Sequence, residues 1–186
     1  MQAELETGAT TAAKRLIGCE LIRTFPEGEV RVRIVETESY DQHDMASHSF
    51  NGKTNRNAVM FGPAGTLYVY FTYGMHYCCN VVTGKQGDGS AVLIRAVEPI
   101  AGQTIIEKYR KKIGLAATNG PAKLCQALSI NTELNGHILS DAPLKLVMGR
   151  PVNDSQITVT TRVGISKAAH EARRFYLTES RYVSQR

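Results

Sequence analysis

Glu38 is the residue of this sequence best suited to chemistry, because it ends a strand-like stretch whose apolar residues alternate with arginines, EVRVRIVETE (29–38). If that strand stays regular, its period of two places Glu36, Glu38 and Tyr40 on the apolar side. A carboxylate held rigidly and partly desolvated can take a proton from water, so Glu38 is a candidate general base. The alternative is a strand-end glutamate that caps backbone amides or pairs with Arg31 or Arg33. For Glu36 we favour such a structural role.

Tyr73 is the second candidate, because it lies between the stretches GTLYVYF (65–71) and HYCCNVVT (76–83), which are rich in aromatic and β-branched residues. These stretches predict a hairpin with an aromatic tip. A tyrosine there can act as a wedge that fills the gap left by an extruded nucleotide, unless the tip folds back onto the body. Tyr40, Tyr68, Tyr70 and Tyr77 offer further aromatic faces for stacking, although most strand tyrosines are core or edge residues.

Asn80 and Arg95 are polar residues inside otherwise apolar strands, and burying either without partners is unfavourable. Each therefore needs a hydrogen-bond network or a ligand. An asparagine can read a purine edge, and an arginine can hold a phosphate or a carboxylate. A wholly structural network is the alternative for both.

The composition indicates which partners, metals and cofactors to expect. The net charge of +5 and the sequence pI near 9.1 make an anionic partner such as nucleic acid plausible, although many basic proteins bind nothing anionic. The stretch DQHDMASH (41–48) resembles a metal site but lacks a third well-spaced nitrogen or sulfur ligand. The four cysteines form neither a zinc pattern nor a disulfide framework. We therefore expect buried thiols, no metal and no cofactor.

The 186 residues predict one domain, 1–186, of the α+β class, with mostly antiparallel strands and helices packed around them. No apolar run approaches the roughly 20 residues that span a bilayer, and the amino terminus lacks a signal-peptide core. We expect a soluble protein, located in the cytoplasm near the nucleoid in a bacterium or in the nucleus of a eukaryote. Patterning and turn residues predict helices over 12–18, 102–112 and 122–130, and strands over 19–25, 29–38, 65–71, 76–83, 91–99, 143–148, 157–163 and 173–178.

Five motifs together resemble the alkyladenine, or 3-methyladenine, DNA glycosylase family. They are RIVETESY (33–40), ASHS (46–49), MFGPAGTLYVYFTYGMHYCCN (60–80), QGDGSAVLIRAVEP (86–99) and NGPAKLCQAL (119–128). The resemblance is colinear over nearly the whole chain. It implies a curved antiparallel sheet with a protruding hairpin that inserts a tyrosine into the minor groove.

The resemblance also implies a role for each matching residue. Glu38 would activate water and Tyr73 would intercalate. Tyr40 and Tyr70 would sandwich the flipped base, with His48 adding stacking and hydrogen bonding. The remaining matches are Asn80, which would disfavour normal guanine, Arg95, which would lie near the backbone of the flipped nucleotide, and Lys123, which would contact a DNA phosphate.

The implied activity is hydrolysis of the N-glycosidic bond of damaged purines, whether alkylated, deaminated or etheno adducts, in double-stranded DNA. No lysine stands out as an amine nucleophile, so we expect no strand-cleaving lyase activity, and we expect a monomer. Two other classes fit parts of the pattern. A noncatalytic DNA or RNA binding module would share the charge and the aromatic residues, and a hydrolase of free nucleosides would share the paired carboxylates.

Overall fold

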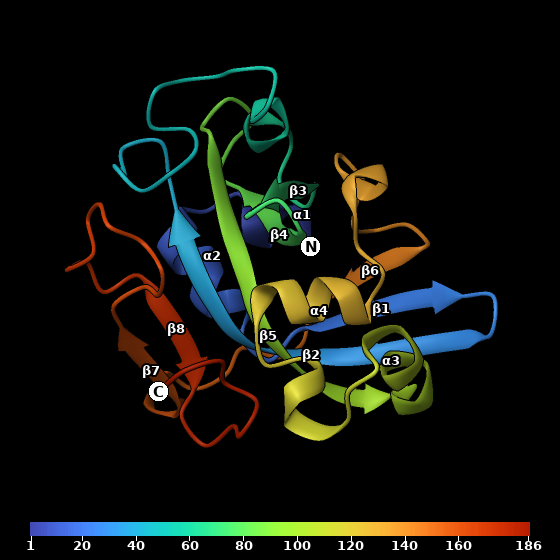
Figure 1. The fold of residues 1–186 in the computed structure, drawn as a ribbon. Coiled ribbons are helices and arrows are strands. Elements are labelled where there is room, and N and C mark those ends of the chain that lie inside the picture. Colours follow the sequence, from blue (N-terminus) through green and yellow to red (C-terminus); the bar gives the residue numbers. More distant parts are fainter.

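The longest strand, β2 (Gly28–Tyr40), runs through the middle of the sheet and carries Glu38 near its end (Figure 1). A computed structural model describes all residues from 1 to 186. The strand pairs with β5 (Ser90–Ala101) along one edge. Its other edge pairs first with β1 (Glu20–Phe25) and then, from Glu36 to Glu38, with β8 (Arg174–Leu177). The residues around Glu38 are therefore covered on both edges.

The strands form one curled antiparallel sheet in the order β3, β4, β5, β2, β1, β6, while β7 joins through β8. The predicted α+β class with a curved, mostly antiparallel sheet is confirmed. The remaining strands are β3 (Leu67–Thr72), β4 (His76–Thr83), β6 (Leu144–Val147) and β7 (Ile157–Thr160). The helices are α1 (Gln2–Leu5), α2 (Ala9–Leu16), α3 (Gln103–Arg110) and α4 (Pro121–Ala127), with short 3₁₀ turns at Ala58–Phe61, Gly114–Ala117, Thr132–Leu134 and Asp154–Gln156.

The regular alternation predicted for β2 does not extend to its end. The register against β5 shifts between Ile34 and Glu36 and again between Glu36 and Thr37. Register shifts of this kind arise at β-bulges and similar irregularities, and bulges re-aim side chains next to functional sites. Beyond the shifts, Thr37 and Ser39 turn their hydroxyl groups to α2, with Thr37 Oγ1 donating to the Ala13 carbonyl oxygen at 3.0 Å. Glu36, Glu38 and Tyr40 consequently share the opposite face, as the alternation of a strand requires.

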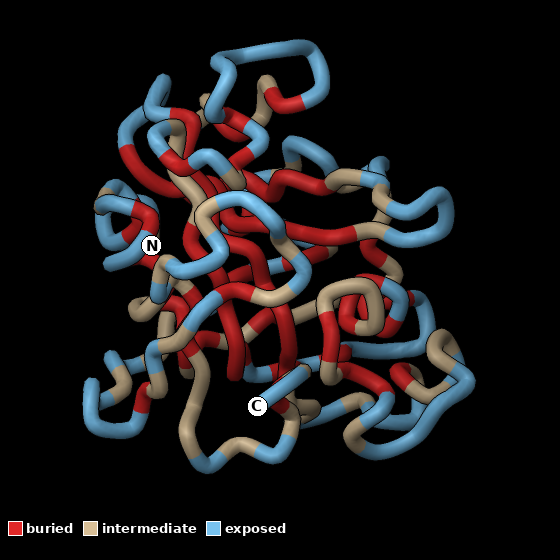
Figure 2. The backbone as a smooth tube through the Cα atoms, turned by 60° about the vertical axis from the view of Figure 1, so that its left-hand side comes forward, coloured by how far each residue is buried: buried red, intermediate tan, exposed pale blue.

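Helices cover the sheet on two sides. In Figure 1, α2 lies behind β2 and α4 lies in front of β5. The helix α4 packs against both β4 and β5. One cluster of 31 buried residues forms the core, and it includes Ala12, Ala13 and Leu16 of α2 and Leu124 of α4. Figure 2 shows this core as buried strands at the centre, ringed by exposed loops. None of the helices is long and apolar enough to cross a membrane.

Most predicted elements differ from the observed ones by one to three residues at an end, and the structure explains two of these differences. The helix predicted over 12–18 spans Ala9–Leu16, because Gly18 takes a left-handed conformation that ends it. The strand predicted over 157–163 ends at Thr160, since Arg162 is drawn into a buried ion pair with Asp44 instead of continuing the strand.

Candidate active site

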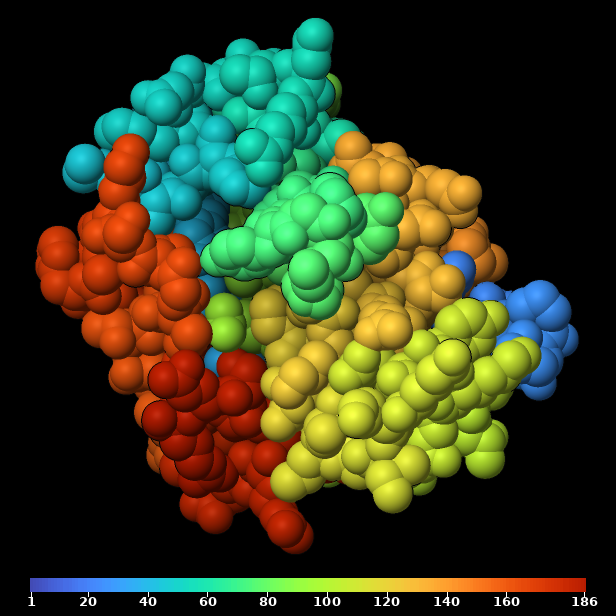
Figure 3. Space-filling view, viewed as in Figure 1, coloured from blue at the N-terminus to red at the C-terminus, as the bar shows by residue number.

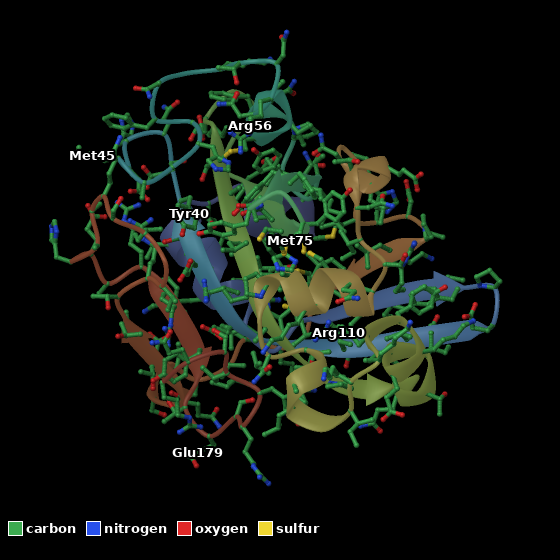
Figure 4. The ribbon with its side chains drawn as sticks, in the orientation of Figure 1. Tyr40, Met45, Arg56, Met75, Arg110 and Glu179 are labelled. Carbon is green, nitrogen blue, oxygen red and sulfur yellow. The ribbon has the colours of Figure 1, made fainter.

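A cavity of about 200 Å³ lies where the end of β2 meets the hairpin of β3 and β4. It is smaller than the clefts of about 300–1,000 Å³ that hold drug-sized ligands, and so it suits a single planar ring system. Five of the predicted site residues line it, namely Tyr40, His48, Tyr70, Tyr73 and Asn80, together with Ala46, Met60, Tyr68, Thr72, Gly164 and Ile165. Figure 4 places Tyr40 at the end of β2 and Met75 on the neighbouring hairpin.

The hairpin register explains how three lining residues converge. Tyr68 and Tyr70 are two residues apart on β3 and therefore share a face, and Asn80 on β4 pairs directly with Tyr68. The Asn80 amide donates to the Tyr68 carbonyl oxygen at 3.1 Å, which fixes its orientation. Tyr68 was considered from the sequence only as a further aromatic face, yet it is buried and lines the cavity.

His48 reaches the cavity from the loop between β2 and β3. Its Nδ1 lies 3.0 Å from the Tyr68 hydroxyl oxygen, and its ring meets Tyr70 edge-on with ring centroids 4.6 Å apart. Burial, with a smaller effect of the Arg56 charge, lowers the pKa of His48 below its ordinary value. The imidazole is therefore neutral at pH 7 and offers one donor and one acceptor.

Burial raises the pKa of both phenols that flank the cavity, Tyr40 and Tyr70. Glu38 adds to the effect at Tyr40, because a second negative charge beside the carboxylate is unfavourable. Both hydroxyl groups therefore remain protonated at any physiological pH.

Glu38 lies one hydrogen bond behind the cavity wall and is fully buried. Its Oε2 accepts from the Tyr40 hydroxyl at 2.8 Å, and its Oε1 accepts from the Val163 backbone N–H at 2.8 Å. Arg95 Nη1 lies 3.2 Å from the same Oε1. Of the structural alternatives for Glu38, pairing with Arg31 or Arg33 does not occur, since those arginines pair with Glu20 and Glu98. Contact with a backbone amide does occur, through the Val163 N–H. Three partners together hold the carboxylate rigidly.

Arg95 is buried between two carboxylates. Its Nε donates to Glu36 Oε1 at 3.0 Å, and its Nη2 donates to the Ser184 hydroxyl at 3.2 Å. Arg174 adds a second guanidinium, with Nε 3.4 Å from Glu36 Oε1. Two carboxylates and two guanidinium groups thus balance in charge within the protein, as buried charges must. The predicted contact of Arg95 with the DNA backbone stays a prediction, and Glu36 has the structural role that we favoured.

Sequence reasoning missed Arg162, which is buried against the back of the site. Its guanidinium contacts both carboxylate oxygens of Asp44, donates to the Ser39 carbonyl oxygen at 3.0 Å, and lies 4.6 Å from the centre of the Tyr40 ring. The next residue, Val163, supplies the N–H that binds Glu38. Asp44, which belongs to the stretch that resembles a metal site, is thus an ion-pair partner of Arg162. Arg162 contacts the ring of Tyr40, and the residue that follows it binds Glu38.

Tyr73 stands at the tip of the hairpin with 81% of its surface exposed, and Met75 beside it is 70% exposed. The tip does not fold back onto the body. In Figure 3 the hairpin stands forward of the surrounding surface, between the loop of residues 41–57 and α4. Tyr73 has a φ of 51°, a left-handed conformation that is strained for an aromatic residue and that recurs at functional sites. The backbone thus presents the ring outward at the mouth of the cavity.

Lys123 lies in the first turn of α4, outside the cavity lining. Its Nζ donates to Asn119 Oδ1 at 2.7 Å. Its predicted contact with a DNA phosphate is not tested by this geometry and stays a prediction.

Comparison with known proteins identifies the relatives of this chain. Residues 3–181 match the family model described as methylpurine-DNA glycosylase. A protein of Carboxydothermus hydrogenoformans is 50% identical over 94% of this chain and 92% of its own length. One of Methanoculleus marisnigri is 49% identical over 97% and 96%, and one of Francisella tularensis subsp. tularensis is 44% identical over 100% and 98%. All three carry the name "Putative 3-methyladenine DNA glycosylase". This chain therefore belongs to the methylpurine-DNA glycosylase family.

Proposed function

We propose that this DNA glycosylase turns damaged purines out of duplex DNA into the cavity and hydrolyses their N-glycosidic bonds with water activated by Glu38. The observation that carries the proposal is a buried, charge-paired carboxylate directly behind a base-sized aromatic cavity with an exposed tyrosine at its mouth. Family membership makes the protein a hydrolase that acts on alkylated bases in DNA. The substrate range and the steps below are our proposal.

The contacts of Glu38 leave it able to act as a base. An ionised carboxylate has about four lone-pair positions, of which two accept hydrogen bonds from Tyr40 and Val163 and a third faces Arg95. A remaining position can accept a proton from water. As a cationic alkylated purine departs as a neutral base with the electrons of the glycosidic bond, the sugar gains oxocarbenium character, which the same carboxylate stabilises. A neutral lesion such as hypoxanthine also takes up a proton from solvent as it leaves. The water oxygen bonds to the anomeric carbon, its proton passes to Glu38, and an abasic sugar remains.

The cavity favours hydrolysis without strand cleavage. A lyase reaction needs an amine that attacks the sugar, and none of the cavity-lining residues is a lysine. Lys123, the lysine expected to contact a DNA phosphate, lies outside the cavity lining and donates to Asn119. We therefore propose a monofunctional enzyme. We also propose that it acts as a monomer and uses no cofactor.

Selectivity would have two sources. Damaged or mispaired nucleotides cost less to extrude than normal ones. Inside the cavity, the base would stack on Tyr40 and Tyr70. Its hydrogen-bonding edge would contact His48 and the oriented Asn80 amide. The exocyclic amino group of a normal guanine would clash with Asn80. 3-Methyladenine, hypoxanthine and ethenoadenine lack an amino group at that position and avoid the conflict. Alkylated guanines such as 7-methylguanine keep this group, so their selection would rest on easier extrusion. Alkylated, deaminated and etheno purines are the proposed substrates.

The proposed function is tested by measuring free base released from duplexes that carry 3-methyladenine, 7-methylguanine, hypoxanthine or ethenoadenine. We expect release from lesion duplexes, little from normal DNA, and abasic sites without strand breaks. Because phosphate contacts dominate duplex affinity, activity at low enzyme concentration should fall as salt rises. Binding without release of any base would favour a noncatalytic module, and salt-insensitive cleavage of free nucleosides would favour a nucleoside hydrolase.

Tyr73→Ala is expected to weaken binding to a lesion duplex by about 10- to 100-fold, because stacking on one aromatic ring is worth roughly 1–3 kcal/mol. Cleavage of the same lesion in a single strand should change far less, since no stack must be held open. Tyr73→Phe keeps the ring and is the matched control, for which we expect nearly full duplex binding. Equal effects of Tyr73→Ala on both substrates would argue against a wedge.

A further inference from the structure

We propose that Ser184, near the carboxyl terminus, is a positioning residue for base release, because it orients Arg95 on Glu38 through the buried Glu36. The inference rests on the proposed function, in which Glu38 is the base. It assigns a role to a segment without regular secondary structure that lies outside the cavity lining.

Glu36 depends on Ser184 for its hydrogen bonds. The carboxylate is fully buried, and its Oε2 has a single donor, the Ser184 backbone N–H at 2.6 Å. Its Oε1 accepts from the Ser184 hydroxyl at 2.9 Å and from Arg95 Nε at 3.0 Å. A buried carboxylate left short of donors is strongly unfavourable. Ser184 therefore fixes which way the Glu36 carboxylate faces.

Arg95 carries this orientation to Glu38. Each of its three nitrogens has a different partner: Nε contacts Glu36, Nη2 donates to the Ser184 hydroxyl, and Nη1 faces Glu38. A guanidinium is rigid and planar, so two of these contacts determine where the third nitrogen lies. The Ser184 hydroxyl accepts from Arg95 and donates to Glu36, which closes a ring of three residues. This ring of hydrogen bonds therefore sets the position of Arg95 Nη1 beside Glu38.

The chain around Ser184 is anchored so that it can hold this position. Val183 before it is buried, and the Gln185 carbonyl oxygen after it accepts from Arg174. Arg174 lies opposite Glu38 in the register of β8 with β2. The segment around Ser184 is thus attached to the same buried charged groups that hold Glu38.

The first test compares Ser184→Ala with wild type on a 3-methyladenine duplex, measuring the single-turnover rate of base release and the dissociation constant separately. We expect release to fall about tenfold with unchanged lesion binding, since one hydrogen bond to a charged group corresponds to about a factor of ten. Ser184→Thr keeps the hydroxyl and should restore most of the rate. Ser180→Ala is the matched control, because its hydroxyl accepts only from the Tyr182 N–H and should not alter release.

The second test does not depend on activity. The Arg95 Nε–H is buried against Glu36, so its NMR signal, assigned with Arg95→Lys, should exchange slowly with solvent. In Ser184→Ala the signal should shift and exchange faster, while Ser180→Ala should leave it unchanged.

The two tests separate the possible failures. Unchanged release by Ser184→Ala, equal losses of release and binding, or slower release with an unchanged Arg95 signal would each overturn the positioning role. If wild type releases no base, the proposed function fails, and an unaltered Arg95 signal in Ser184→Ala would show that Ser184 does not orient Arg95 either.

Discussion

Replacing Glu38 with glutamine is expected to lower the rate of base release by about 1,000-fold, within the range of 10²–10⁴ that a general base contributes. The amide keeps nearly the same shape but cannot take a proton from water or stabilise a positive sugar with a full charge. Binding to a lesion duplex should be retained, because Glu38 lies behind the cavity wall and forms none of its lining. Single-turnover release and equilibrium binding, measured on the same duplex, check both parts.

The network around Glu38 makes this substitution a sharp test. The amide oxygen can accept from the Val163 N–H as the carboxylate does, and the amide nitrogen can donate to the Tyr40 hydroxyl oxygen. Arg95 keeps Glu36 as its partner, so the variant should fold. Glu98→Gln is the control, since Glu98 pairs with Arg33 at the partly exposed far end of β5. Full turnover by Glu38→Gln would remove Glu38 from the mechanism.

Much of the cavity could be predicted from the sequence because its residues sit on strands with clear patterning. The hairpin around Tyr73 was expected over 65–71 and 76–83, and β3 and β4 lie within those limits apart from Thr72. Once the hairpin is known, the period of two brings Tyr70 and Asn80 to one face. Its protruding tip was implied by the family resemblance, whereas the residues alone left open that the tip folds back onto the body.

The residues that hold the site in place from behind the cavity could not be predicted in the same way. Arg162 meets Asp44 across 118 positions, and Ser184 meets Glu36 across 148. Loops and chain ends have no periodic pattern that says which polar residues become buried, so nothing local distinguishes Arg162 from an exposed arginine. The register shift beside Glu36 could not be predicted from the sequence either, because it depends on how β2 and β5 pair.

The pair of Arg162 and Asp44 carries the largest expected effect on stability. Neither side chain is exposed to solvent, and removing one partner of a buried pair costs about 3–5 kcal/mol, because the other charge is left without compensation. Asp44→Ala should therefore lower the free energy of unfolding by about that amount and the melting temperature by about 10 °C. Thermal and denaturant unfolding measure the two quantities.

Asp41→Ala is the matched control, because Asp41 lies in the same loop and pairs with Arg173 while both side chains remain partly exposed. An exposed pair is worth about 0–1 kcal/mol, so this variant should unfold almost as wild type does. The double variant Asp44→Ala with Arg162→Met should be more stable than Asp44→Ala alone, since it removes the uncompensated charge. Similar losses for Asp41→Ala and Asp44→Ala would refute the assigned role of the buried pair. If the pair acts as described, Asp44→Ala should also slow base release, because Val163, which follows Arg162, donates to Glu38.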